Sequence, residues 1–492
     1  MTRDFDFFTF FLDSYFFFSI PNPTSEDSPS LLEDLQIEDQ NVFKITDKGP
    51  DFRGLTCFGA AALVVKTQFG LGILGLPHTF YILGVIPGLI SLITLCILTT
   101  WSGVVVGHFR LRHPHTYSIG DAAEILFGPA GREFMGAAFW LFYTLAYGAT
   151  VLTVSIAFNA ITSHAACTTV WTAVGAIISL ILGTATRTLK VMSWMGVAAI
   201  VSLFVSVWIV AIACLTQDTP SAAPKNEAIE KGIAAVATGK SYAAVASAVA
   251  TQLAGLSGTA SFFTIHTEMR DQRQYNKALY LGQGFVAFNY IIITCIVYAK
   301  VGKYVTSPAL GSAGPLIKKI CYGIALPGLI FSCFFLAHLA GKYCLVRILR
   351  GTRHLQMNTP THWTTWISMM LLAIVFGFVI ASAIPFFGDL VALIAALFGT
   401  TFSLIIPGFI AVYNLGSNVK REGDGTLWWF SGCIKAWKKN RWSVINTLTA
   451  ALSVSLGAYI LVTGTYGSVQ SIIDGYRNGT VSHAFACEDN SG

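Results

Sequence analysis

Two short stretches of this chain place polar residues and glycines inside long apolar runs. The first reads KTQFGLGILGLP, in which Lys66 and Gln68 precede three glycines and Pro77. The second, residues 248–271, reads AVATQLAGLSGTASFFTIHTEMRD and gathers glycines and hydroxyl groups at its centre. A proline removes a backbone donor from a helix, and polar side chains are costly deep in a membrane. Both stretches therefore predict an interrupted helix.

An interrupted helix exposes backbone groups that can bind a charged ligand. The start of its second half carries partial positive charge and favours a carboxylate, while the freed carbonyl groups favour an ammonium group or a cation. A zwitterionic amino acid offers both charges, so we predict a substrate site at the two breaks. Its candidate residues are Thr67, Gly70, Leu71, Gly72, Gly255, Ser257, Gly258 and Thr259.

The elements that hold these stretches are predicted to be membrane helices. Of the 492 residues, 54% are hydrophobic and 11% charged, against about 25% charged in soluble proteins, and the mean hydropathy is +0.63. A crossing takes about 20 helical residues. The predicted spans are 54–81, 82–109, 134–162, 170–185, 191–215, 242–266, 278–298, 317–345, 363–384, 390–413 and 444–465.

These spans predict an all-α integral membrane domain over residues 53–465 with about eleven transmembrane helices. We expect a cytosolic tail over 1–52, with much of it disordered, and an extracytosolic tail over 466–492. The second break lies five spans after the first. This spacing is typical of transporters built from two inverted five-helix repeats whose first helices are discontinuous, here helices 1 and 6, and it leaves one extra helix.

The distribution of basic residues predicts the orientation. With the N-terminus in the cytosol, 22 of the 31 Lys and Arg residues lie inside and 8 lie outside, with Lys66 in a span. The C-terminus is then outside, where Asn478 begins an Asn-Gly-Thr glycosylation triplet. The ten cysteines show no C-x-x-C pair and no zinc-like spacing with histidine, so we expect neither a disulfide framework nor a metal site.

Both stretches, read with their surroundings, resemble the amino acid/auxin permease family. FGAAALVVKTQFGLGILGLPHTFYILGVIPGLI is similar to the first two helices of that family, in which a G-x-G-x-L-x-x-P pattern marks the unwound first helix. HTEMRDQRQYNKAL is similar to its Glu-Met-basic-Asp segment, with Gln272 where the family usually has proline. The resemblance covers residues 53–465 and extends to fungal neutral amino acid permeases of the methyltryptophan-resistance type.

This resemblance implies a transporter of the APC superfamily with the LeuT-type fold and proton-driven import of amino acids. The partners are then a neutral L-amino acid with a large aliphatic or aromatic side chain, protons and the lipid bilayer. No cofactor, metal or nucleic acid is implied, and the sequence gives no oligomeric state. The outward triplet and the fungal relatives favour the plasma membrane over the vacuole.

Two side chains are candidates for coupling. Lys66 follows Arg53 by 13 residues, which places it about 20 Å deeper along a helix, so it is predicted to couple protons or to occupy the place of a cation. A structural ion pair is the alternative for Lys66. His338 lies in the eighth span and is a candidate proton carrier, with a neutral, hydrogen-bonded histidine as its alternative.

Other residues are candidates for the pocket wall and the inner gate. The LeuT-type fold places aromatic residues of the third and sixth helices around the substrate, which suggests Tyr147 and Phe262, although packing is the alternative. Glu268, Arg270 and Asp271 are predicted near the inner mouth, either as gate residues or as a solvated surface pair.

Three alternatives stay open at this point. A sensor of permease fold would bind an amino acid with little flux. A sodium-coupled transporter would need carbonyl and hydroxyl ligands, for which Ser332 is the one evident hydroxyl near the centre of the eighth span, and Lys66 would repel the ion. A membrane enzyme ranks last, because the sequence shows no zinc-protease, serine-hydrolase or phosphate-loop motif.

Overall fold

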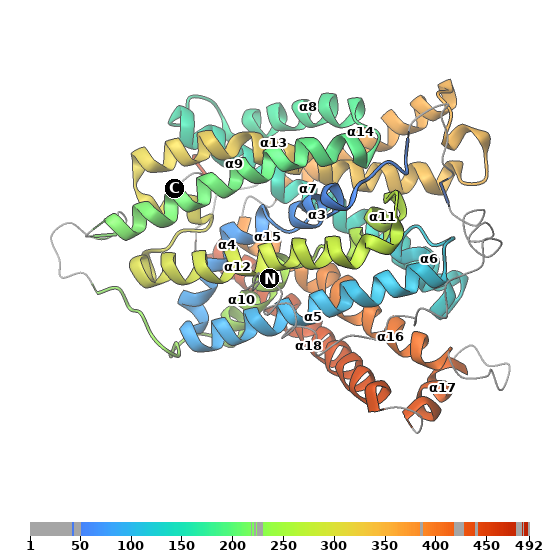
Figure 1. The fold of residues 1–492 in the computed structure, drawn as a ribbon. Helices are drawn as coiled ribbons and strands as arrows, with labels where there is room; N and C mark the ends of the chain where they lie inside the picture. The colour runs from blue at the N-terminus through green and yellow to red at the C-terminus, as the bar shows by residue number, and fades with distance from the viewer. Residues whose placement is uncertain are drawn as a thin grey trace, which may run out of the picture.

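The computed structural model describes residues 42–43, 51–217, 219–220, 223, 230–383, 387–417, 428–437, 441–478, 485 and 487–490. Nine helices within these residues are long and apolar enough to cross a membrane. Two further crossings are each built of two short helices, so the prediction of eleven spans is confirmed (Figure 1).

The chain runs through two sets of five crossings and one extra helix. The first set is α3 (Cys57–Lys66) with α4 (Leu71–Leu83), α5 (Val85–Arg112), α7 (Pro129–Thr162), α8 (Thr168–Ala185) and α9 (Leu189–Thr216). The second set is α10 (Tyr242–Ala254) with α11 (Thr259–Glu268), α12 (Tyr275–Val301), α13 (Pro315–Leu349), α14 (Pro360–Ala383) and α15 (Phe387–Ile394) with α16 (Ile406–Gly416). The extra helix is α18 (Arg441–Arg477), and two short helices, α6 (Ile119–Phe127) and α17 (Trp428–Trp437), connect crossings.

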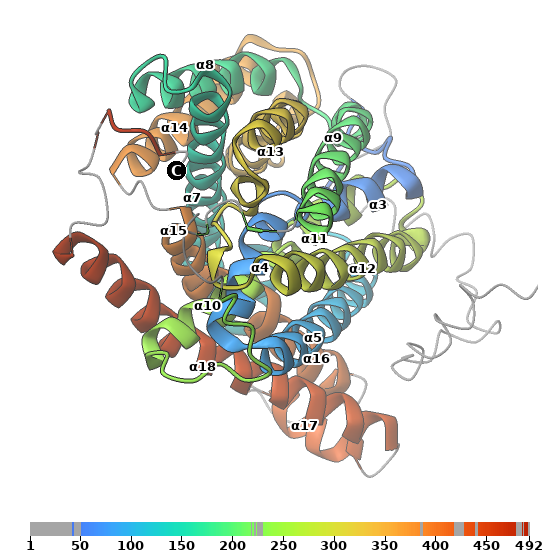
Figure 2. The ribbon, with the colours of Figure 1, turned by 90° about the vertical axis from the view of Figure 1, so that its left-hand side faces the viewer.

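Viewed along the helices, the crossings form two groups (Figure 2). Helices α7, α8, α13 and α14 pack against one another on one side. Helices α4, α5, α10 and α12 pack together on the other side, and α18 lies along the outside of α10 and α16. The two broken crossings lie where the groups meet, which places them at the centre of the molecule.

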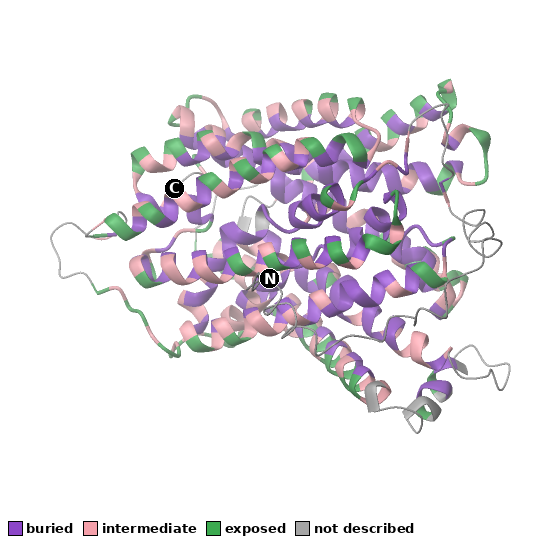
Figure 3. Ribbon diagram, viewed as in Figure 1, coloured by how far each residue is buried: buried purple, intermediate pink, exposed green. Residues whose placement is uncertain are grey.

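The burial pattern fits a bilayer as the surrounding solvent (Figure 3). The central helix α7 is 83% buried in its most apolar segment, whereas the peripheral α18 is 28% buried. Large apolar side chains such as Trp194, Leu316 and Val462 are exposed on the outside of the bundle. In a membrane these surfaces face lipid, so their exposure is not costly.

The tenth crossing is irregular at its middle. Two π-helical segments, Ala395–Gly399 and Thr401–Ile405, separate α15 from α16. Such π turns are rare and occur frequently at functional sites. Gly399 lies directly against the Ser257 side chain, so this irregular segment packs on the break of the sixth crossing.

The sequence analysis expected no disulfide framework and missed one disulfide bond. Cys167, just before α8, is bonded to Cys487 near the C-terminus, while eight other cysteines are free. The last crossing also extends past the predicted end at residue 465, because α18 continues to Arg477. Asn478 lies in an exposed turn directly after it, and the rest of its glycosylation triplet lies outside the described residues.

Candidate functional site

The two predicted breaks are present and touch each other. The first lies between Lys66 and Leu71, and the second between Ala254 and Thr259. A Cβ atom added to Gly72 would overlap the Cα atom of Gly255. At this contact the backbones approach so closely that only glycine fits.

Tyr290, on α12, joins the two breaks through its hydroxyl group. The hydroxyl lies 2.8 Å from the carbonyl oxygen of Gln68 and 3.0 Å from that of Gly255, and its one hydrogen is shared between these two acceptors. The ring is fully buried and stacks on Phe69, with ring centroids 6.2 Å apart. Sequence reasoning missed this role, since a tyrosine in an apolar run is usually a packing residue.

Lys66 joins the first break to α13. Its Nζ atom donates to Ser332 Oγ at 2.7 Å and to the carbonyl oxygens of Gly328 at 3.1 Å and Phe69 at 3.4 Å. The side chain is 4% exposed. All three partners are neutral oxygen atoms, which are the ligands that a hard cation would use. The ammonium group therefore occupies a position suited to a bound cation.

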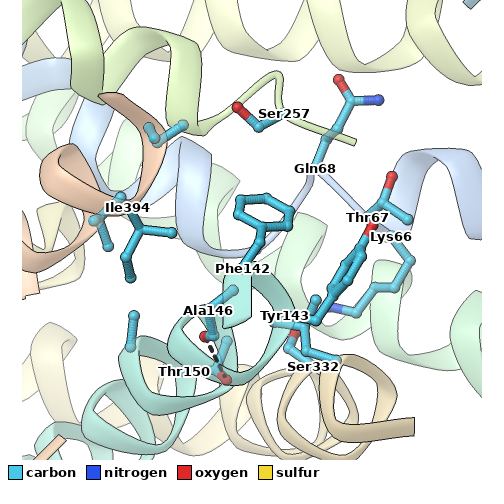
Figure 4. A pocket seen from close by; sticks show the side chains of 16 residues that line it. Lys66, Thr67, Gln68, Phe142, Tyr143, Ala146, Thr150, Ser257, Ser332 and Ile394 are labelled. Carbon is cyan, nitrogen blue, oxygen red and sulfur yellow. Dashed lines mark hydrogen bonds between the residues drawn. The ribbon is translucent and has the colours of Figure 1, made fainter. Parts of the chain in front are cut away.

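A cavity of about 60 Å³ lies beside Lys66, between the breaks and helices α7, α13 and α15 (Figure 4). It has room for about four water molecules, since each needs about 10–15 Å³. Polar side chains from the breaks, α7 and α13 line one part: Lys66, Thr67, Gln68, Tyr143, Thr150, Ser257 and Ser332. Apolar residues line the other part: Phe142, Ala146, Ala149, Ala254, Leu336, Val391, Ile394 and Ala395.

The electrostatics of the cavity favour a carboxylate. Neither α4 nor α11 has a side-chain cap at its N-terminus, so both helix starts keep their partial positive charge, although the Ser261 amide already donates to the carbonyl oxygen of Gly258. Lys66 is the one charged residue among those that line the cavity in the described part of the chain. The C-terminal ends of α3 and α10 carry partial negative charge at the same depth, which suits an ammonium group.

The structure brings most of the predicted site residues together. Three of them line the cavity: Thr67, Gly70 and Ser257. Three lie where the breaks contact each other: Gly72, Gly255 and Gly258. Thr259 begins α11, and its buried hydroxyl has no hydrogen-bond partner among the described residues. Leu71 begins α4, and its side chain is outside the described part.

The two aromatic residues predicted to line the substrate pocket are not among the described residues that line the cavity. Tyr147 is fully buried against Gly377 of α14, and Phe262 packs against Gly103 of α5. Tyr143, one helical turn before Tyr147, lines the cavity together with Phe142. The cavity is therefore lined by α7, the helix of Tyr147, but by other aromatic side chains of that helix.

His338 is not among the described residues that line the cavity. Its Nδ1 atom lies 3.0 Å from the carbonyl oxygen of Thr186, and its ring lies 5.1 Å from that of Trp366 on α14. This geometry favours the alternative of a hydrogen-bonded, buried histidine.

Glu268 forms a buried ion pair that the sequence did not reveal. Its carboxylate pairs with Lys342 of α13, and both side chains are 1% exposed. The backbone N–H of Leu189 also donates to this carboxylate, at 3.2 Å. The ring of Phe52 covers the pair, with its centroid 4.5 Å from Lys342 Nζ, and stacks on Phe43 at 4.8 Å.

The other two gate candidates are exposed. The backbone N–H of Arg270 donates to the carbonyl oxygen of Leu55 at 2.9 Å, which ties α11 to the residues before α3. Asp271 accepts from the backbone N–H of Arg273 at 3.0 Å and caps a short 3₁₀ helix.

Sequence reasoning could have found the partner of Glu268. Lys342 lies four residues after His338 in an apolar run, and a lysine in such a run indicates a buried partner.

Comparisons with known proteins agree with this architecture. The sequence model of the family described as transmembrane amino acid transporter protein matches residues 53–461. A transmembrane transporter of Gibberella moniliformis is 30% identical over 455 residues, which cover 92% of each chain. The N amino acid transport system protein of Neurospora crassa is 29% identical over 458 residues, covering 90% of this chain and 92% of the relative.

Among solved structures, the chain is similar to Mhp1, a nucleobase-cation-symport-1 family transporter in a closed conformation with bromovinylhydantoin bound. The TM-score is 0.50 and the identity 15%, over 92% of this chain and 99% of that chain. At this identity the likeness concerns the fold. It confirms the LeuT-type arrangement that the broken helices predict.

Proposed function

The chain belongs to the family of transmembrane amino acid transporter proteins, and from this premise we propose that it imports neutral L-amino acids with large aliphatic or aromatic side chains by proton symport. The observation that carries the proposal is the cavity between the two breaks. It combines two uncapped helix N-termini and one lysine with an apolar wall.

The composition of the cavity supports a neutral substrate. The α-carboxylate would lie at the uncapped start of α4, near Gly70, and the α-ammonium group would lie at the ends of α3 and α10. The side chain would then extend toward Phe142, Ala146 and Ile394. A cationic side chain would meet Lys66 in a site without a compensating acid among the described lining residues, so it is disfavoured.

We assign coupling to Lys66. Its ammonium group donates hydrogen bonds from the first break to α13. These bonds are a contact between the two groups of helices. Loss of its proton would remove the charge that these oxygen atoms solvate and would weaken this contact. Binding of a proton and movement of the break are linked in this way, which is the requirement for symport.

We assign the inner gate to the Glu268–Lys342 pair. Glu268 lies on α11, on the substrate-binding crossing, and Lys342 lies on α13 of the other group. Opening to the cytosol would require the pair to separate and Phe52 to move away from it. Alternating access would then consist of movement of the broken crossings relative to α7, α8, α13 and α14.

The orientation that we propose has the N-terminus in the cytosol and the C-terminus outside, in the plasma membrane. The excess of basic residues supports it. The Cys167–Cys487 disulfide supports it as well, because it links the α7–α8 connection to the C-terminal residues, and disulfides persist in oxidising compartments outside the cytosol.

The test is uptake into vesicles that contain the purified protein. Labelled phenylalanine, leucine, glutamate and lysine are supplied under an imposed pH gradient and then under a sodium gradient, with protein-free vesicles as the control. We expect accumulation of phenylalanine and leucine under the pH gradient, abolished by a protonophore. Accumulation under sodium alone would overturn proton coupling. Binding of phenylalanine without uptake would instead indicate a sensor.

A further inference from the structure

Oxygen atoms converge at two positions beside the breaks, and a side chain of the protein fills each of them. At the first, Lys66 Nζ donates to Phe69 O of the first break and to Gly328 O and Ser332 Oγ of α13. At the second, the Tyr290 hydroxyl shares its one hydrogen between Gln68 O of the first break and Gly255 O of the second. The mechanism proposed above uses Lys66 and leaves Tyr290 without a role.

The position of Tyr290 is narrowly defined. The residue is fully buried, its ring stacks on Phe69, and its hydroxyl lies 2.5 Å from the position that a Cβ atom on Gly72 would take. The hydroxyl is therefore held at the point where both breaks pass each other. Without it, the Gln68 and Gly255 carbonyl oxygens would face each other inside the protein with no donor between them.

Two carbonyl oxygens pointing at one position need a positive or hydrogen-donating group there. Buried carbonyl groups without a partner are costly, and converging carbonyl oxygens are typical ligands of hard cations. We propose that the Tyr290 hydroxyl takes the place of a bound monovalent cation between the two breaks, so that the site is held together there without an ion. Tyr290 is thus a positioning residue that keeps Gln68 and Gly255 in register.

This inference rests on the proposed function, since it concerns how the transport site is assembled, but it can be tested without any amino acid. The experiment measures the thermal unfolding midpoint of the purified full-length protein in sodium chloride and in choline chloride at equal ionic strength. The variant is Tyr290→Phe, which removes the hydroxyl group and keeps the ring that stacks on Phe69.

Tyr275→Phe is the matched control. Tyr275 lies on the same helix, is equally buried, and donates its hydroxyl to a single carbonyl oxygen, that of Gly103, at 3.3 Å. Its removal also leaves a buried carbonyl group without this donor, but it exposes no convergent pair. Any effect common to both variants is therefore the general effect of losing a buried hydroxyl group.

We expect sodium to raise the midpoint of Tyr290→Phe by at least about 2 °C more than that of the wild type or of Tyr275→Phe, because an ion that binds the vacated carbonyl pair stabilises the folded state. An equal sodium response in all three proteins would overturn the proposal. If Tyr290→Phe is too unstable to purify in choline, recovery in sodium is the supporting result, and loss in both salts is the overturning one. Because no substrate is present, failure of this test is separate from failure of the uptake test.

Discussion

Replacement of Gly72 by alanine gives the most direct test of the contact between the breaks. The added Cβ atom would overlap the Gly255 Cα atom and approach the Tyr290 hydroxyl within 2.5 Å. Neither neighbour can retract easily, because one is backbone and the other is bonded to both breaks. The breaks would have to separate by about 1 Å to reach normal contact distances.

The magnitude follows from this displacement. Separation by about 1 Å removes the hydrogen bond that the Tyr290 hydroxyl donates, worth about 1 kcal/mol, and overpacking costs about 1–3 kcal/mol more. Alanine is favoured over glycine in a helix by about 1 kcal/mol, which offsets part of the loss. A net cost of about 1–3 kcal/mol corresponds to a fall in kcat/KM of about fivefold to about 140-fold, at tenfold per 1.4 kcal/mol.

The assay is the initial rate of phenylalanine uptake into vesicles under a pH gradient, over a range of concentrations. Gly284→Ala is the matched control, because Gly284 lies on α12 and its added Cβ atom would meet nothing within 4 Å. We expect the control to transport within twofold of the wild type, about the scatter of an exposed substitution. Wild-type uptake by Gly72→Ala would refute the reasoning, since it would show that the two breaks are not in contact in the working protein.

Four further predictions concern the remaining parts of the site. Lys66→Gln should abolish accumulation driven by a pH gradient but leave exchange of labelled for unlabelled phenylalanine, because a neutral donor remains; full accumulation would contradict the coupling role. Glu268→Gln or Lys342→Met should each lower the free energy of unfolding by about 3–5 kcal/mol, and the double variant should recover most of it, whereas additive losses would argue against the pair. Cys167→Ser should abolish the mobility difference between reduced and non-reduced protein on gels and lower stability by about 2–4 kcal/mol; an unchanged difference would exclude the bond. Ala146→Phe, which fills the apolar wall, should reduce phenylalanine uptake at least about tenfold and affect alanine less, and equal losses for both substrates would count against a side-chain subsite at Ala146.

The class of the molecule and the place of its breaks could be predicted from the amino-acid sequence alone. The length and spacing of the apolar runs decide the number of crossings, because a bilayer imposes the same length on every helix. The interruptions are local features: at the first break the glycines and the polar residues around Lys66 disfavour a continuous helix, whereas Pro77 lies inside α4 and does not interrupt it. Inverted repeats then follow from the five-span separation.

Which side chains meet depends on tertiary packing. Tyr143 lines the cavity, whereas Tyr147, about one turn later, packs against Gly377 of α14. The partners of Lys66 and Glu268, the bridging role of Tyr290 and the disulfide of Cys167 join segments far apart in the chain. The hydrophobic period and the composition of the sequence describe neighbours along one helix. The pairs between helices depend on how each helix is rotated and shifted when it packs, and all contacting surfaces together determine this.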